Sequence, residues 1–211
     1  MLNINKININ CHSSIRIDGE KVIYVDPYKI EEDANDADYI FITHSHYDHF
    51  SPEDIEKVIK RDTVIIVPEE MEHIAKEILK DEQRLYIVEP GNFHMLGSLD
   101  FETISAYNIS KEFHPKEKGW VGYNIKIEDT WCYIAGDTDV TEENKKVKCD
   151  IALLPIGGTY TMDYKEAIEL VQSINPKAVI PTHYGCIVGD KELGNKFKEK
   201  LGGNIYCVLK I

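Results

Sequence analysis

A six-residue segment of this chain holds side chains of the types that bind divalent metal ions. Three of the eight histidines stand here, at His44, His46 and His49, with Asp48 among them. They follow the expected strand Tyr39–Thr43, whose apolar residues indicate a buried strand at the centre of a sheet. Residues two apart in an extended segment point the same way, so His44 and His46 can bind one ion together. Asp48 and His49 then fall in the turn before a helix and can face a second ion.

Two later strand ends add polar side chains of the same kind. The expected strand Trp131–Ala135 is followed by Gly136 and Asp137, and the expected strand Ala178–Pro181 is followed shortly by His183. Glycine lets the backbone turn close to an ion, and a carboxylate beside it can bridge two metals. Taken alone, the aspartate is more typical of a turn and the histidine of a hydrogen-bonded core. Because the histidine-rich segment is also present, we interpret both Asp137 and His183 as metal ligands instead.

The elements that must position these residues can be read from hydrophobic periodicity. Strands come first as a meander, then strands alternate with helices, and the pattern partly repeats in the second half. One helix begins after Ser51 with Pro52 at its first position, and another begins after Asp163 with Glu166 three residues on. This order predicts an α/β fold, a four-layer αββα sandwich of two mixed β-sheets with outer helices. We expect a single domain over residues 1–211.

Composition limits the classes of partner. A chain of 211 residues with 43% hydrophobic and 29% charged residues is typical of a soluble globular protein with a real core. The net charge of −13 disfavours nucleic acid and anionic membranes. Five scattered cysteines without a C-x-x-C pair favour reduced thiols in a cytosol, and no apolar run approaches the roughly 20 residues of a membrane span. We therefore expect a cytoplasmic protein with a small-molecule substrate, no nucleic acid and no membrane. The sequence leaves open whether the chain forms a homo-oligomer.

The order H-x-H-x-D-H, then Gly-Asp-Thr, then a strand-end histidine resembles the metallo-β-lactamase superfamily. The resemblance runs over nearly the whole chain and implies the same four-layer fold. Finer features resemble one branch, the L-ascorbate-6-phosphate lactonase-like metal-dependent hydrolases. These features are Cys11-His12-Ser13, Val25-Asp26-Pro27, Leu154-Pro155-Ile156-Gly157-Gly158 with Thr161-Met162, and Pro181-Thr182-His183-Tyr184.

The resemblance also implies a ligand set for two divalent ions. The first site would comprise His44, His46 and a third histidine, and the second site would comprise Asp48, His49 and His183, with Asp137 bridging both. The superfamily usually places the third histidine at the end of a strand, where this chain has Asn108. His114 follows six residues later and could reach the first site from a loop. The alternatives are Asn108 itself or water.

Two further residues acquire roles from the resemblance. His12 matches a histidine that the branch keeps near its active site, where it would bind substrate or shield the site. Asp26 ends another expected strand and would orient metal-binding histidines from behind, as such sites require.

These residues together predict a hydrolase. Two divalent ions can hold a bridging hydroxide that attacks an ester, lactone, amide or phosphodiester bond in a small cytosolic molecule. Asp48 would guide the water or accept its proton, and His12 is the second candidate catalytic residue. Histidine and carboxylate ligands suit zinc first, and manganese and iron are compatible. The sequence has no Gly-x-Ser-x-Gly elbow, so no side-chain nucleophile is expected.

Three alternatives follow from the same pattern. Di-iron redox proteins of this fold have the pattern H-x-E-x-D-H and carry a flavin module. This chain has His46 where that pattern has glutamate. A non-catalytic metal-binding or interaction module is favoured only by Asn108, where one ligand is missing. Nucleases of related fold are longer chains with an added RNA-binding part. The acidic net charge of this chain disfavours a nuclease function.

Overall fold

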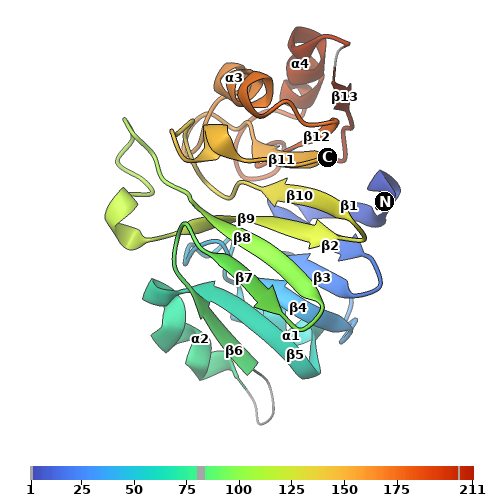
Figure 1. Cartoon of the computed structure of the whole chain (residues 1–211), viewed down its shortest axis with the longest axis vertical. Coiled ribbons are helices and arrows are strands. Elements are labelled where there is room, and N and C mark those ends of the chain that lie inside the picture. Colours follow the sequence, from blue (N-terminus) through green and yellow to red (C-terminus); the bar gives the residue numbers. More distant parts are fainter. Residues whose placement is uncertain (1, 80–83, 204) are drawn as a thin grey trace.

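Two β-sheets form the centre of the molecule, as the computed structural model describes it for residues 2–79, 84–203 and 205–211. Within these residues the first sheet has six strands in sequence order (Figure 1). The strand β1 pairs antiparallel with β2 and β2 with β3, and the strands from β3 to β6 are parallel. The strands are β1 (Ile7–Cys11), β2 (Ser14–Asp18), β3 (Val22–Val25), β4 (Ala37–Phe41), β5 (Ile59–Pro68) and β6 (Arg84–Val88).

The second sheet is also mixed. Its seven described strands run in the order β13-β12-β11-β10-β9-β8-β7. The strands from β7 to β10 are antiparallel neighbours, and those from β10 to β13 are parallel. The strands are β7 (Phe93–Leu96), β8 (Leu99–Ser105), β9 (Val121–Ile127), β10 (Thr130–Ile134), β11 (Ile151–Pro155), β12 (Ala178–Thr182) and β13 (Tyr206–Cys207).

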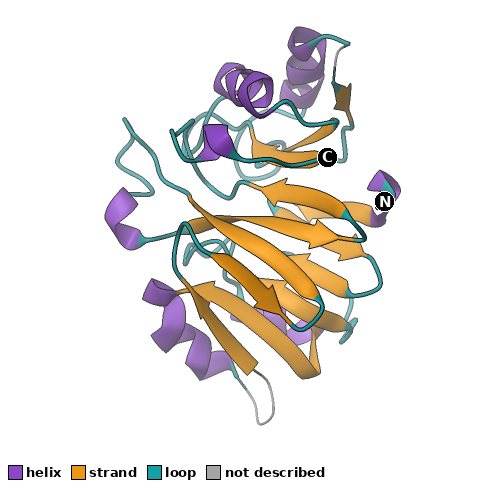
Figure 2. Cartoon of the chain, in the orientation of Figure 1, coloured by secondary structure: helices purple, strands orange, loops and turns teal. Residues whose placement is uncertain are grey.

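Helices cover the outer faces of both sheets. Figure 1 shows α3 and α4 at one end of the molecule and α2 at the other, and Figure 2 shows the strands between the helices. The α-helices are α1 (Pro52–Val58), α2 (Glu72–Ile78), α3 (Tyr164–Ile174) and α4 (Glu192–Leu201). Short 3-10 helices lie at Ile4–Lys6, Glu69–Met71, Lys116–Lys118 and Asn144–Lys146.

Three separate apolar layers establish the four-layer arrangement. The middle layer lies between the sheets, where Phe41 of β4 contacts Phe101 of β8 and Tyr123 of β9 edge to face. The neighbouring Ile40 points to the opposite face of β4, into the layer beneath α1 and α2. A third layer packs β10 to β12 against α3 and α4 and includes Phe197. The predicted αββα sandwich of two mixed sheets is confirmed.

Local sequence signals account for several boundaries. The Ser51 hydroxyl accepts a hydrogen bond from the Asp54 backbone at the start of α1, with Pro52 as the first helical residue. Asp163 and Glu166 form a capping box at the start of α3. The strand β7 is a short edge strand whose residues alternate between exposed and partly buried, so the hydrophobic pattern of the sequence does not indicate it.

The described helices are all too short or too polar to cross a membrane. The organisation of residues 1–211 as a single domain stays a prediction.

Candidate metal centre

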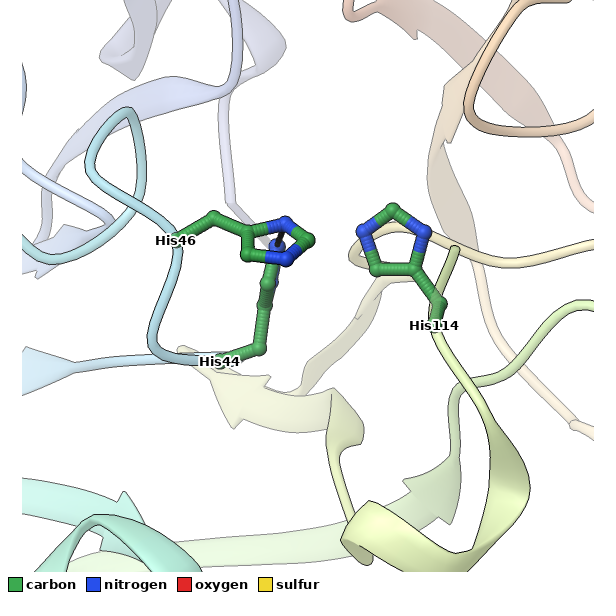
Figure 3. A group of neighbouring side chains, drawn as sticks. All are labelled: His44, His46 and His114. Atoms are coloured by element: carbon green, nitrogen blue, oxygen red, sulfur yellow. Dashed lines mark hydrogen bonds between the residues drawn. The ribbon is translucent and has the colours of Figure 1, made fainter. Parts of the chain in front are cut away.

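The first site is assembled from the end of β4 and from a loop that follows β8. His44 and His46 come directly after β4, and His114 comes from the segment between β8 and β9. Figure 3 shows His46 and His114 facing each other across a common space that His44 enters from below. His44 Nε2 lies 3.1 Å from His46 Nδ1, and one nitrogen of each ring lies within 4.8 Å of the others. Such a group of three histidines can bind one divalent ion.

The other predicted ligands lie in two further groups, of which one contains His12 and the other shares His44 with the first group. His12, Asp48 and His183 have ligand atoms within 4.8 Å of one another, and so do His44, His49 and Asp137. His12 is completely buried, and its Nε2 lies 3.4 Å from Asp48 Oδ2. The structure therefore brings His12 as close to Asp48 and His183 as a ligand would be, which sequence reasoning did not anticipate.

Asp137 lies between the two sites. Its Oδ2 is 3.3 Å from Nε2 of His114 in the first site and 2.9 Å from Nε2 of His183 in the second. Its Oδ1 is 3.4 Å from His49 Nε2, and Oδ2 is 4.0 Å from His44 Nε2. A carboxylate that contacts histidines of both groups has the position of a bridging ligand.

The Asn108 amide contacts the loops around His114, whereas His114 itself belongs to the group of three histidines. The Asn108 backbone N–H donates to the carbonyl of His114 over 2.9 Å. Its side-chain amide donates to the carbonyls of Phe113 and Tyr160 at 2.9 and 2.7 Å and lies 3.2 Å from His114 Nδ1. These contacts join the two loops and hold His114 against the site.

Asp26 supports the second site from behind. The carboxylate is buried and accepts three hydrogen bonds of 2.7–2.8 Å, from the Thr43 backbone N–H, the Thr43 hydroxyl and His49 Nδ1. With its proton on Nδ1, His49 presents the lone pair of Nε2 toward Asp137 and Asp48. The expectation that Asp26 orients a metal-binding histidine agrees with this geometry.

Several site residues share an uncommon backbone conformation. His12, His114 and His183 have φ values of 60°, 59° and 56°, and Asp26 has 49°. Non-glycine residues with positive φ are uncommon and gather at functional sites, where the surrounding structure holds them. Gly157 allows this at His183, since a Cβ on Gly157 would lie 2.4 Å from the His183 carbonyl oxygen. No sequence pattern signals these conformations.

The protonation states suit cation binding at most positions. Burial, with the nearby His49, lowers the pKa of His44 well below its usual value, and burial and His114 lower the pKa of His46. Burial opposes ionisation of Asp137 and Asp48. Histidines contacting each of them outweigh burial, so both carboxyl pKa values are lowered. Neutral imidazoles and ionised carboxylates are the forms that bind metal.

His49 is the exception, and it predicts a pH dependence of metal binding. Burial opposes its charge, but Asp137 and Asp26 on either side outweigh burial and raise the His49 pKa well above its usual value. The metal-free site therefore holds a proton on His49 at pH 7, where an ion must replace it. We expect binding to release about one proton, and affinity to rise about tenfold per pH unit below the raised pKa. Calorimetric titration in two buffers of different ionisation enthalpy measures this release, and identical heats in both buffers would contradict it.

Buried atoms without hydrogen-bond partners test whether the residues fit a cation. Among the described residues, His49 Nε2, His114 Nε2, Asp137 Oδ1 and both ring nitrogens of His12 are of this kind. Buried polar atoms are normally satisfied, and these are chemically the donors that divalent ions take. The set fits one or more divalent cations.

The residues around the site have distinct structural roles. Trp120 packs against His44 and His46, with ring centroids 5.0 Å apart in both cases. Its indole N–H donates to Glu70 Oε2 at 3.1 Å, so Glu70 supports the first site, which the sequence did not indicate. His73 is an exposed residue of α2 that faces Glu77. His94, unassigned from the sequence, stacks on Phe101.

Comparison with known proteins gives a consistent result. A family model described as β-lactamase superfamily domain matches residues 4–183. A Nanoarchaeum equitans protein named as a metal-dependent hydrolase is 32% identical over 209 residues, which cover 92% of this chain and 91% of that protein. A Staphylothermus marinus protein of the same name is 34% identical over 198 residues, 87% of this chain and 82% of that protein.

Solved structures share the fold. A Parabacteroides distasonis crystal structure described as a metal-dependent hydrolase aligns with a TM-score of 0.78 and 30% sequence identity. The alignment covers 96% of this chain and 91% of that chain.

Proposed function

This chain belongs to the β-lactamase superfamily, and from that membership and its donor set we propose that it is a metal-dependent hydrolase with a dinuclear centre. One observation carries the proposal of two ions. Asp137 contacts His44 and His114 on one side and His49 and His183 on the other. The similarity to relatives named as metal-dependent hydrolases supports the reaction class.

The proposed ligand set follows the two groups of side chains. The first site comprises His44, His46 and His114, and the second comprises Asp48, His49 and His183, with Asp137 shared. Zinc suits this set of histidines and carboxylates first, and manganese or iron is compatible. Bound there, two such cations would activate a water at neutral pH and stabilise negative charge on the reacting oxygen.

The chain's own residues would handle the proton. Asp48 is kept ionised by His12 and His49 against the effect of burial, so its Oδ2 can accept a proton from the attacking water. His12 Nε2 lies 3.4 Å from that oxygen, and burial lowers the His12 pKa, so a neutral imidazole backs the carboxylate. His12 is completely buried and Asp48 largely so, and their interaction is stronger in such surroundings than in water.

The proposed substrate is a small cytosolic molecule with an ester, lactone, amide or phosphodiester bond. The sequence motifs that resemble the lactonase-like branch support this choice. A di-iron redox protein of the same fold is a weaker alternative, since this chain has His46 at the position where such proteins have a glutamate.

Metal content tests the two-ion proposal. We expect inductively coupled plasma mass spectrometry to find about two equivalents in the purified protein and about one in His114→Ala, because a first site left with two histidines binds weakly. His73→Ala is the matched control, since it removes an exposed histidine of α2 that belongs to none of the ligand groups. One equivalent or fewer in the unmodified protein, unchanged by His114→Ala, would overturn the dinuclear proposal and favour a non-catalytic metal-binding module.

A further inference from the structure

The ligand groups open into a cavity of about 260 Å³. Its base consists of six of the residues discussed above, His12, His46, Asp48, His114, Asp137 and His183. Its remaining wall is formed by Tyr47, Phe113, Tyr160 and Ile187. The cavity therefore has a polar base, where a reacting bond would lie, and an apolar wall, where the rest of a substrate would lie.

The apolar wall exposes aromatic surface that a folded protein normally buries. Tyr47 is 65% exposed and Phe113 is 45% exposed, and the Phe113 ring meets the Tyr160 ring edge to face with centroids 4.7 Å apart. Exposed apolar surface gathered at a cavity is typical of a ligand site. The Asn108 side chain holds the backbone carbonyls of Phe113 and Tyr160, so the two rings are fixed in place before a ligand arrives.

The side chains that line the cavity give an anionic group no cationic partner away from its base, where the proposed divalent ions would supply the positive charge. The charged side chains of its lining are the carboxylates Asp48 and Asp137, and the whole chain carries a net charge of −13. The cations of the loop leading to the cavity face carboxylates: Lys111 pairs with Asp139, Lys116 with Glu143 and Lys118 with Glu70. Sites that select phosphate or carboxylate groups normally present arginine, lysine or a helix N-terminus to them.

From this lining we infer that the substrate carries, beside the reacting bond, an uncharged group made of one aromatic ring or a short apolar chain, and that Phe113 and Tyr160 select this group. The inference rests on the proposed hydrolase function and narrows it, since substrates with a phosphate or carboxylate group away from the reacting bond, such as phosphorylated lactones, are disfavoured.

Binding of hydroxamates tests the inference without requiring turnover. Acetohydroxamate, benzohydroxamate and 4-carboxybenzohydroxamate share one metal-chelating group and differ in the part that meets the wall. Titrated into the zinc-loaded protein by calorimetry, benzohydroxamate should bind at least roughly tenfold tighter than acetohydroxamate, because its ring buries apolar surface. The 4-carboxy compound should lose most of that gain. Equal affinity of all three, or tightest binding of the anionic compound, would overturn the inference.

Two variants locate the effect. Phe113→Ala and Tyr160→Ala each remove a ring but keep the backbone carbonyl that Asn108 holds, so the loop and His114 stay in place. Both should bring the benzohydroxamate affinity close to that of acetohydroxamate, with unchanged metal content. Phe93→Ala is the matched control, because Phe93 is an exposed phenylalanine of β7 that does not line this cavity. A preference that survives both ring deletions would exclude Phe113 and Tyr160 as its source.

Turnover separates this inference from the proposed function. The zinc-loaded protein is assayed with 4-nitrophenyl benzoate and bis(4-nitrophenyl) phosphate. Hydrolysis of either compound that falls in Phe113→Ala and Tyr160→Ala supports both the inference and the proposed function. Hydrolysis that neither variant changes would keep the hydrolase function and overturn selection by these rings. A ring preference in hydroxamate binding without hydrolysis of either compound would instead count against the hydrolase function alone.

Discussion

Asp137→Asn is expected to empty both metal sites and to reduce hydrolysis by at least about a thousandfold. The carboxylate contacts histidines of both groups, so its loss removes a shared negative ligand from each ion. Metal-derived charge stabilisation in a hydrolytic transition state contributes several kcal/mol, and each 1.36 kcal/mol is tenfold in rate. Asparagine keeps the shape but is a neutral and weaker ligand. Metal content and kcat/KM on an activated ester, measured on the same preparation, report both effects.

Asp139→Asn provides the matched control for this variant. Asp139 lies two residues away and is equally buried, but its carboxylate accepts from the Ile109 backbone at 2.9 Å and pairs with Lys111. Its replacement should leave metal content near the unmodified value and reduce thermal stability, since the ion pair between the buried carboxylate and the half-buried Lys111 is lost. Two equivalents of metal retained in Asp137→Asn would show that this carboxylate is not the bridge.

Local spacing was sufficient to predict the part of the site that lies on one strand end. His44, His46, Asp48 and His49 follow one buried strand, and their positions depend on the period of an extended chain and one tight turn. The αββα order was predictable for a similar reason. Phe41 and Ile40 alternate between two apolar layers, so a strand with no polar face had to be covered on both sides.

The remaining part depends on contacts between distant segments, which periodicity does not report. His114 reaches the first site because Asn108 ties its loop to Tyr160, 52 residues away. The position of His12 beside His183 rests on a backbone hydrogen bond between the two residues and on positive φ values at both. The cavity wall combines Tyr47, Phe113 and Tyr160 from three loops, and the way these side chains meet there followed from the three-dimensional structure.

Asp26 offers a test that separates the stability of the site from its capacity to bind metal. Asp26→Ala would leave the Thr43 backbone N–H, the Thr43 hydroxyl and His49 Nδ1 buried without their acceptor. Removing one partner of a buried charged pair costs about 3–5 kcal/mol, so the free energy of unfolding should fall by that amount. Urea denaturation of the metal-free protein measures it. A change below 1 kcal/mol would contradict the role of this carboxylate in the buried network.

Asp26→Asn is expected to keep most of that stability and yet to weaken metal binding by about 10–100-fold. The Thr43 backbone N–H can only donate, so it fixes the amide oxygen on its side and turns the amide NH₂ toward His49 Nδ1. His49 must then accept at Nδ1 and carry its proton on Nε2, the atom that faces Asp137 and Asp48. The ion would lose this ligand while the fold is retained. Proton-detected NMR of the His49 ring reports the tautomer, and a chelator competition reports the affinity. Unchanged affinity with the proton on Nε2 would exclude His49 from the ligand set, whereas weakened binding in a stable protein would assign Asp26 the task of directing the Nε2 lone pair to the ion.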